Sequence, residues 1–242
     1  MRRNERILAV LRRLARDTRN GRYREAPVYQ GSFETTRSPF MELVACLISQ
    51  RVRDETTTRV CAELFAIART PEQILSLPRE RLRRLLFGAG FYNQKSDQLR
   101  ALARTVSARG GVPRTREGLL ELPGIGPKCA NLVLANCYGE PAIAVDTHVH
   151  RISNRMDWVR TKTPETTEEA LTPLVPIRWR ARVNAFLVAH GQLVCRPTAP
   201  RCEDCRVAEW CRRRGVLPRD AANRRRERPR RRDRVSRAPS FR

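Results

Sequence analysis

The chain has 242 residues, of which 40% are hydrophobic and 31% are charged, so it can bury a core without depending on disulfides. A formal net charge of +24 and a pI near 11.3 predict a polyanionic partner, with nucleic acid ahead of an anionic membrane surface. No apolar run approaches the ~20 residues that cross a bilayer, and the N-terminal residues enter an amphipathic pattern without a secretory signal. We therefore expect neither a transmembrane nor a secreted protein.

Helical patterns follow one another through most of the chain. Apolar residues recur at helical spacing from Ile7, and Ser38-Pro39 supplies an N-cap and a first-turn proline for an apolar helix to about Ile48. A short helix is predicted to begin at residues 70–71. The other predicted helices span 54–68, 79–87, 93–109, 115–120, 127–137, 146–156, 164–174 and 178–189. Because no run shows the period-two alternation of strands, we predict a compact all-α protein.

The last residues of the chain have a different composition. Residues 219–242 hold 11 arginines and 3 acids, with almost no large apolar side chains. Such a segment buries too little to offset the entropy of ordering it, so we predict a disordered tail over 218–242. The tail either solubilises the protein or contacts phosphate without sequence preference.

Lysines are rare in this basic chain. Lys95, Lys128 and Lys162 stand among 46 arginines, a mix that a genome-wide preference for arginine would also produce. Arginine stays protonated and cannot act as an amine nucleophile. If the protein needs an amine, there are three candidates.

The eight cysteines fall into two groups. Four lie inside apolar helical patterns, where we expect them to act as small hydrophobic residues rather than as a disulfide framework: Cys46, Cys61, Cys129 and Cys137. The other four have the spacing C-x6-C-x2-C-x5-C and are Cys195, Cys202, Cys205 and Cys211. Four thiolates within seventeen residues predict a metal site. The spacing favours a [4Fe–4S] cluster over zinc, and unligated or disulfide-bonded cysteines come third.

A glycine-containing turn joins two of the predicted helices at 122–130. Gly124 and Gly126 are expected to allow positive φ and close backbone approach, and Ile125 to anchor the turn in the core. Pro127 suits the first position of the next helix, whose N–H groups then point outward at a phosphate. This is the pattern of a helix-hairpin-helix motif that binds the DNA backbone, although a G-x-G turn alone is also found in ordinary helix corners.

Two residues near this turn are candidates for chemistry. Lys128 either binds phosphate or acts as a nucleophilic amine, which the positive helix end and the nearby arginines would keep partly neutral. Asp146 follows a short apolar run and opens a helix, so it is an N-cap, a carboxylate facing the C1′ of an extruded nucleotide, or both. Thr147 and His148 follow it and are candidate DNA-binding residues, and His148 is interpreted as a polar pocket or packing residue.

Together these segments resemble the endonuclease III family of DNA glycosylases, in the helix-hairpin-helix Gly/Pro-Asp superfamily. The resemblance runs from about Ser38 to Cys211 and is carried by Leu122-Pro-Gly-Ile-Gly-Pro-Lys128, Val145-Asp-Thr-His148, Ala189-His-Gly191 and the cysteine spacing. It implies a two-domain fold, with a six-helix domain at 30–140 that carries the hairpin. The other domain, at 1–29 and 141–217, would hold the four cysteines as ligands of a [4Fe–4S] cluster.

The resemblance also implies a reaction. A damaged base, typically an oxidised pyrimidine, is flipped out of duplex DNA; Lys128 attacks C1′, and β-elimination cuts the strand 3′ to the abasic site. Asp146 assists base departure. Gln50, Arg51 and Phe91 lie where the family places DNA-filling loops, whereas Phe91 alone could equally be a buried plug. The implied protein is a monomer that binds damaged or abasic double-stranded DNA, away from membranes, in the nucleoid region of a prokaryotic cytoplasm.

Some positions depart from the family pattern. Gln50-Arg51 stands where many bacterial members have Ser-Ala-Gln-Ala and is closer to archaeal members, and Cys129 replaces a common Thr. One alternative is a monofunctional glycosylase for adenine or for thymine and uracil mismatches, but Cys46 stands where the adenine enzymes have a catalytic Glu. The thymine branch lacks the amine that Lys128 supplies. A further alternative is a non-catalytic iron–sulfur DNA-binding protein, which would not need both Lys128 and Asp146.

Overall fold

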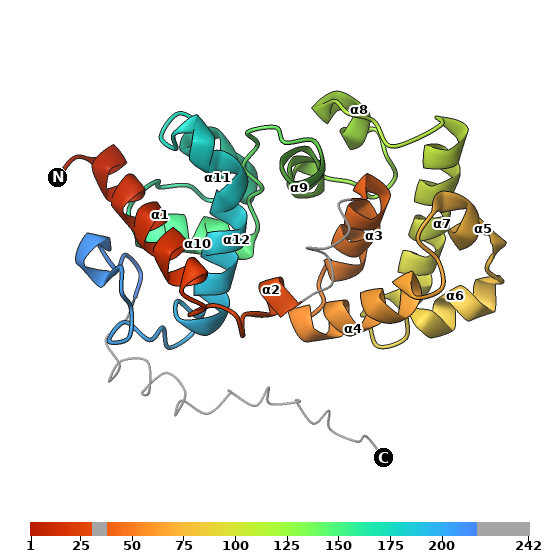
Figure 1. Cartoon of the computed structure of the whole chain (residues 1–242), viewed down its shortest axis with the longest axis horizontal. Coiled ribbons are helices and arrows are strands. Elements are labelled where there is room, and N and C mark those ends of the chain that lie inside the picture. The colour runs from red at the N-terminus through yellow and green to blue at the C-terminus, as the bar shows by residue number, and fades with distance from the viewer. Residues whose placement is uncertain (31–37, 217–242) are drawn as a thin grey trace, which may run out of the picture.

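Figure 1 shows the computed structural model, which describes residues 1–30 and 38–216. These residues form α-helices, one 3-10 helix and no strand, which confirms the predicted all-α class. The first helices are α1 (Arg3–Arg19), α2 (Pro27–Gln30), α3 (Pro39–Ser49), α4 (Asp54–Phe65), α5 (Pro71–Ser76), α6 (Arg79–Leu85) and α7 (Tyr92–Ala108). They are followed by α8 (Arg116–Leu120), α9 (Pro127–Cys137), α10 (Thr147–Arg155), α11 (Pro164–Leu171), α12 (Ile177–Leu193) and η2 (Ala208–Trp210).

Capping threonines mark the starts of several helices. The Thr70 hydroxyl accepts the Gln73 backbone N–H before α5, and the Thr163 hydroxyl accepts the Thr166 N–H before α11. A proline follows each threonine at the first helical position, where its missing N–H costs nothing. The predicted starts therefore agree closely with the structure. Only α2 and η2 were not predicted, since four and three residues are too few to show a helical period.

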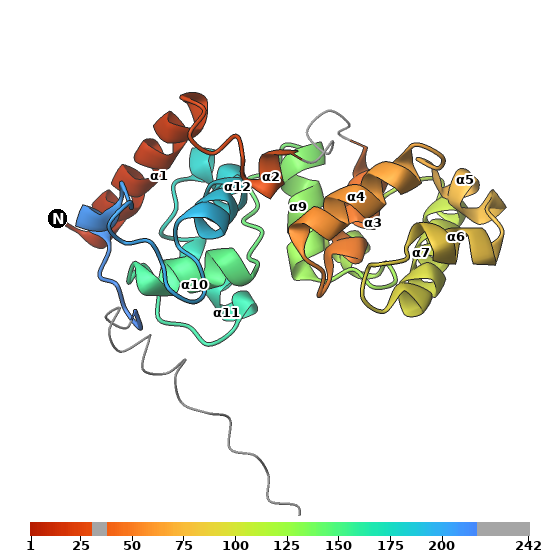
Figure 2. The ribbon, with the colours of Figure 1, turned by 90° about the horizontal axis from the view of Figure 1, so that it is seen from below.

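The helices pack into two groups, each around its own buried cluster. Figure 2 shows α3 to α9 on one side and α1 with α10 to α12 on the other. One cluster includes Leu47, Leu64 and Leu99, and the other joins Leu11 of the N-terminal helix to Trp158 and Leu187. Both clusters lie within the ranges expected for two domains, and the division itself stays a prediction. The predicted tail at 218–242 lies outside the described residues.

Several polar side chains connect the groups. The Gln192 amide of α12 donates to Asp54 Oδ2 at 2.5 Å and accepts the Val28 N–H at 3.2 Å. The segment 143–145 lies between α9 and α10 and belongs to neither helix. No helix within the described ranges is both long and apolar enough to cross a bilayer.

Gly191 of α12 lies against α10, and this close contact can be tested by substitution. A Cβ at this position would collide with His148 Nδ1 and lie 2.9 Å from Arg151 Nη2, which is itself held by the Cys195 carbonyl. We expect Gly191→Ala to lower the free energy of unfolding by about 1–3 kcal/mol because the α10–α12 contact must open. Thermal melting should show a fall of several degrees.

The control for this variant is Gly90→Ala. A Cβ at Gly90 meets nothing closer than 3.7 Å, and its φ is not positive. Equal melting temperatures for Gly191→Ala and the native chain would contradict the packing argument.

Candidate active site

A cleft of about 750 Å³ lies between the two groups of helices. Its walls come from α2, α3, α4, α9 and α12, together with the residue that precedes α10. Lys128 and Asp146 both line it, although eighteen residues separate them in the sequence. The structure therefore brings the two predicted chemical residues into one cavity that is large enough for a nucleotide-sized ligand.

Lys128 is placed by the start of α9. Gly126 is the N-cap of this helix and supplies no side-chain hydrogen bond, and Pro127 occupies the first position. The first N–H groups of α9 are thus left for an external acceptor, and the helix dipole makes this end positive. Half-buried Lys128 lies in the first turn, where its amine borders the cleft.

Hydrogen bonds hold both the side chain of Asp146 and the backbone that precedes it. Its Oδ1 accepts the Val149 N–H at 2.8 Å, which confirms the N-cap interpretation. The preceding backbone is fixed by two amides: Asn131 donates to the Ile143 carbonyl at 3.0 Å, and Asn184 donates to the Ala144 carbonyl at 2.9 Å. Within the described residues no hydrogen bond reaches Asp146 Oδ2. One carboxylate oxygen caps the helix while the other remains available to the cleft.

The hairpin turn agrees with the sequence except at one glycine. Gly124 has φ +77°, and Ile125 is 7% exposed in the core beside it, as expected. The expectation of a positive φ at Gly126 is wrong: its φ is −107° and its backbone is extended. A Cβ at Gly126 would meet nothing within 4 Å, so the missing side chain leaves open space in front of the α9 N-terminus. That space, rather than an unusual φ, suits close approach by a ligand backbone.

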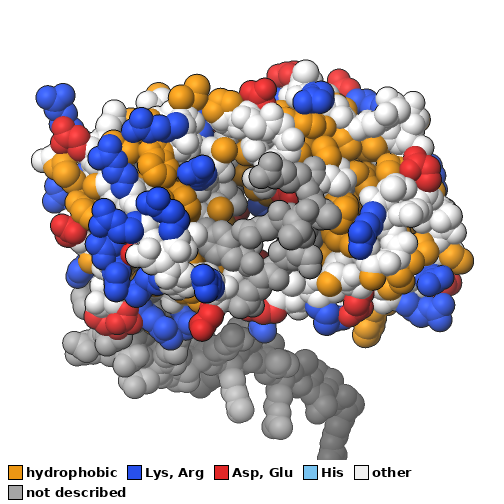
Figure 3. Space-filling model, viewed as in Figure 1, with side chains coloured by type: hydrophobic (Ala, Val, Ile, Leu, Met, Phe, Trp, Pro, Cys, Tyr) orange, Lys and Arg blue, Asp and Glu red, His pale blue; other side chains and the backbone are white. Residues whose placement is uncertain are grey.

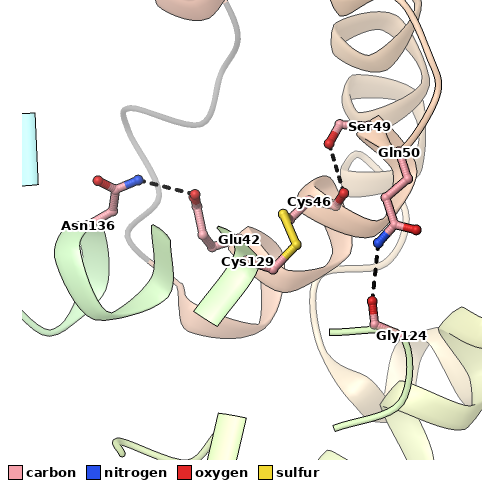
Figure 4. The surroundings of a disulfide bond; sticks show 7 residues. All are labelled: Glu42, Cys46, Ser49, Gln50, Gly124, Cys129 and Asn136. Atoms are coloured by element: carbon pink, nitrogen blue, oxygen red, sulfur yellow. Dashed lines mark hydrogen bonds between the residues drawn. A yellow bond between two sulfur atoms is a disulfide. The ribbon is translucent and has the colours of Figure 1, made fainter. Parts of the chain in front are cut away.

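The three predicted DNA-filling residues lie together near the hairpin. Gln50 Nε2 donates to the Gly124 carbonyl at 3.1 Å, as Figure 4 shows. Arg51 and Phe91 both have left-handed φ, at 57° and 61°, and the Arg51 guanidinium lies 6.0 Å from the Phe91 ring centroid. Phe91 is 61% exposed, so the buried-plug alternative is wrong. Left-handed backbone at two non-glycine residues is costly and typical of functional loops.

Lys95 has a role that sequence reasoning missed. It is 3% exposed, and its Nζ donates to the Ile48 carbonyl at 2.7 Å and the Gln50 carbonyl at 2.8 Å. Burial lowers the pKa of this amine. Lys95 therefore satisfies the C-terminal carbonyls of α3 and fixes the backbone from which Gln50 and Arg51 project. In the sequence, the only indication of this role is that Lys95 is one of three lysines in a chain with 46 arginines.

Cys46 and Cys129 form a disulfide, so the expectation that both are free is wrong. Figure 4 shows the bond joining α3 to the first turn of α9, next to the position of Lys128. The two residues are 83 apart in sequence, and their side chains are 5% and 4% exposed. Each looked like an ordinary core cysteine because the pairing depends on how α3 packs on α9. The bond fixes the helix that carries Lys128.

Glu42 is a second site residue that the sequence analysis missed. Its Oε1 accepts a hydrogen bond from Asn136 Nδ2 at 3.1 Å, and both residues line the cleft. Burial raises the pKa of Glu42, whereas the Asn136 hydrogen bond and the charge of Lys128 act in the opposite direction. The sequence feature that could have indicated Glu42 as a site residue is that it is the single acid in the otherwise apolar helix α3.

The residues after Asp146 lie at different depths. Thr147 is exposed at the start of α10. The half-buried ring of His148 packs against Gly191, and Arg151 Nη2 lies 3.2 Å from its Nδ1. Burial lowers the pKa of His148, and Asp146 partly opposes this shift. The packing interpretation of His148 thus agrees with its contacts, while contact of either residue with DNA stays a prediction.

The four clustered cysteines line one small cavity together with Met156, His190 and Val194. Several donors lie near their sulfurs: Arg155 Nη1 is 3.5 Å from Cys195 Sγ, and the Arg213 N–H is 3.4 Å from Cys211 Sγ. His190 Nε2 lies 3.7 Å from Cys205 Sγ, and its Nδ1 lies 3.1 Å from the Tyr23 hydroxyl. Over the described ranges, no three His, Cys, Asp or Glu side chains gather closely enough to hold a single metal ion.

Residues 44–176 match the family model described as HhH-GPD superfamily base excision DNA repair protein. The chain belongs to this family. Endonuclease III of Thermotoga maritima is 43% identical over 182 residues, which cover 73% of this chain and 85% of that protein.

Two solved structures extend the family relation to the fold. They are a non-covalent endonuclease III–DNA complex and a trapped endonuclease III–DNA covalent intermediate. Each has a TM-score of 0.75 and 29% identity, and the match covers 88% of this chain and 97% of the other. The HhH-GPD arrangement therefore spans nearly all of the described helices.

The Cys46–Cys129 disulfide should stabilise the fold measurably. A cross-link across 83 residues removes loop entropy from the unfolded chain worth about 4 kcal/mol, so Cys46→Ser or Cys129→Ser should melt roughly 10 °C lower. Alkylation of the unfolded, unreduced native protein followed by mass spectrometry should leave both cysteines unlabelled.

The double variant Cys46→Ser/Cys129→Ser is the matched control. Because the same single bond is lost in each case, the double variant should be no less stable than either single variant. Additive losses, or labelling of both cysteines in the native protein, would contradict the disulfide.

Proposed function

We propose that this chain is a bifunctional DNA glycosylase and abasic-site lyase that uses Lys128 as the nucleophile. The supporting observation is that Lys128 and Asp146 line one cleft, each at the N-terminal end of a helix, and that Lys128 directly follows the hairpin turn. Membership of a base excision repair family and the likeness to a covalently trapped endonuclease III–DNA complex support the same reaction.

The amine of Lys128 would act directly at the sugar. Its nitrogen forms a bond to C1′ as the glycosidic C1′–N bond breaks, and the base leaves with the bonding electron pair and takes up a proton. Opening of the C1′–O4′ bond and loss of the amine proton then give an imine. Removal of a proton from C2′ expels the phosphate at C3′, which cuts the strand, and water finally hydrolyses the imine to release Lys128.

Asp146 would stabilise the charge that develops during this step. Positive charge builds on the sugar as the base departs, and a fixed carboxylate lowers the energy of that state without reorganising. Capping of α10 through Oδ1 keeps the side chain in place, and Asn131 and Asn184 hold the backbone in front of it. The same residue thus acts as a cap and as a catalytic carboxylate.

The substrate we propose is an oxidised pyrimidine in duplex DNA. An extruded nucleotide would enter the cleft while Gln50, Arg51 and Phe91 fill the space it leaves in the stack. The exposed α9 N-terminus at Gly126 would bind the adjacent phosphate. Action as a monomer and a location in the prokaryotic nucleoid stay predictions.

We propose that Cys195, Cys202, Cys205 and Cys211 hold a [4Fe–4S] cluster. All four side chains border one cavity, and N–H donors near the sulfurs suit thiolate ligands. The spacing of the four cysteines in the sequence favours a cluster over a zinc ion. When bound, the cluster would serve to fold residues 195–214.

This loop carries much of the positive charge near the cysteines. Figure 3 shows Lys and Arg side chains gathered over the half of the molecule that contains α1. Arg206 pairs with Asp17 and Arg214 pairs with Asp157. In the described part of the chain, the other exposed loop arginines make no ion pair: Arg196, Arg201, Arg212 and Arg213. We propose that they bind DNA phosphates.

Borohydride trapping tests the nucleophile. The native chain should give covalent adducts with duplexes that carry one thymine glycol or one abasic site, and Lys128→Gln should give neither. Lys128→Gln should also lose about 10³-fold or more of the strand-cleavage rate, because the imine cannot form. Asp146→Asn keeps the helix cap, since the amide oxygen still accepts the Val149 N–H, but should lose about 10²-fold or more of the base-release rate.

Lys162→Gln is the matched control, because Lys162 is exposed and does not line the cleft. Its rates should equal those of the native chain, and all variants should melt at similar temperatures. Adducts with Lys128→Gln would contradict the assignment of Lys128 as the nucleophile. Base release by folded native protein without any adduct would favour a monofunctional glycosylase.

Metal analysis tests the cysteine assignment. Anaerobically purified protein should contain about four iron and four sulfide per chain, and Cys202→Ala should lose both. Removal of the iron by chelation should weaken DNA binding and flatten its salt dependence, because the basic loop loses its fold. About one zinc per chain instead of iron would refute the cluster, and unchanged binding after iron removal would refute the role of the loop.

A further inference from the structure

The helix α3 carries one charged residue in an otherwise apolar sequence. Within Pro39–Ser49 only Glu42 is ionisable apart from the disulfide-bonded Cys46, and the residues from Leu43 to Ile48 are all buried. Glu42 is in the first turn, where the helix dipole favours a carboxylate, and it is half-buried. It is therefore the one charged group that α3 presents to the cleft.

The side chain of Glu42 lies on the face of α3 that lines the cleft. Glu42, Cys46 and Ser49 are spaced i, i+4 and i+7, and all three border the cleft. Across from them, α9 presents Lys128 and Asn136, eight residues apart on one face. The Glu42–Asn136 pair thus occupies one end of the α3–α9 wall, two helical turns from the proposed nucleophile.

Hydrogen-bonding capacity remains on this pair after its internal bond. Asn136 Nδ2 donates to Glu42 Oε1 at 3.1 Å (Figure 4). For Glu42 Oε2 and Asn136 Oδ1, the described residues offer no partner, and a carboxyl and an amide together can bind several polar groups. Two acceptors side by side match a ligand that presents N–H groups along one edge.

The pair is not needed to hold the two helices together. The Cys46–Cys129 disulfide already joins α3 to α9, and the Gln50 amide bonds the hairpin at Gly124. A hydrophobic residue at position 42 would pack on α9 without the cost of burying a carboxyl. Burial also raises the pKa of Glu42, while the Asn136 hydrogen bond and the charge of Lys128 lower it.

We propose that Glu42 and Asn136 bind the pairing edge of the extruded pyrimidine base and so determine which bases are released. This inference rests on the proposed glycosylase function and deepens it. The N3–H of a uracil-type ring, or the amino group of a cytosine-type ring, would donate to the free oxygens of the pair. An abasic site lacks this edge and therefore makes no use of the pair.

Single-turnover rates on three duplexes test the assignment, with thymine glycol, 5-hydroxycytosine or a preformed abasic site as the single lesion. We expect Glu42→Leu and Asn136→Leu to slow release of both bases by about 10- to 100-fold, because the polar edge of the base is then left unpaired. Cleavage at the abasic site should change by less than about threefold. Glu42→Gln keeps one acceptor and should fall between the native chain and Glu42→Leu, with a changed ratio between the two bases.

Glu80→Gln on α6 is the matched control, since Glu80 is 74% exposed and far from the cleft lining. Equal slowing on all three duplexes would overturn the assignment and show that Glu42 acts by placing Lys128. Unchanged rates on both base-containing duplexes would overturn it as well. If the native chain cleaved none of the duplexes, the proposed function itself would fail and this assignment with it. Melting temperatures of each variant exclude loss of folding as the cause.

Discussion

The geometry of the site depends on two asparagine side chains, of which Asn131 is buried and Asn184 is half-buried. Asn131 in α9 and Asn184 in α12 donate to adjacent carbonyls of the segment 143–145, which would otherwise be an unpaired buried backbone. Asn131 lies one turn beyond Lys128 on the same helix, so the residue that carries the amine and the segment that carries Asp146 are tied to one element. The position of Asp146 relative to Lys128 is therefore constrained by a direct contact between this segment and α9.

Helix α9 serves several purposes at once because its N-terminus faces the cleft. Its first turn places Lys128, its exposed N–H groups suit a phosphate, and Cys129 joins it to α3. Farther along, Asn136 reaches Glu42. A helix with so many tasks must not rotate or slide, since a shift of one residue would move every one of these groups. The disulfide and the buried Ile125 anchor fix it at the end that carries Lys128.

Features encoded by neighbouring residues were predictable from the sequence, whereas contacts between distant ones were not. Prolines and threonines predicted most helix starts, and the Pro-Gly-Ile-Gly-Pro run predicted the hairpin. Both predictions succeed because capping and turn formation depend on residues that are close in the sequence. The disulfide, the Lys95 contacts and the Glu42–Asn136 pair each join residues 45 or more positions apart. Gly126 was misjudged because a glycine signals either unusual φ or open space, and sequence alone does not separate the two.

The disulfide cysteines and the proposed cluster ligands require opposite chemical conditions, and burial of the disulfide allows both to persist. A disulfide forms by loss of two electrons, while ligands of an iron–sulfur cluster must remain thiolates. Cys46 and Cys129 are almost fully covered, so a small reductant reaches them only when α3 and α9 separate, whereas Cys195 and Cys202 are partly exposed. The barrier to opening the helix pair thus gives the disulfide a long lifetime in a reducing solution, independent of its equilibrium potential.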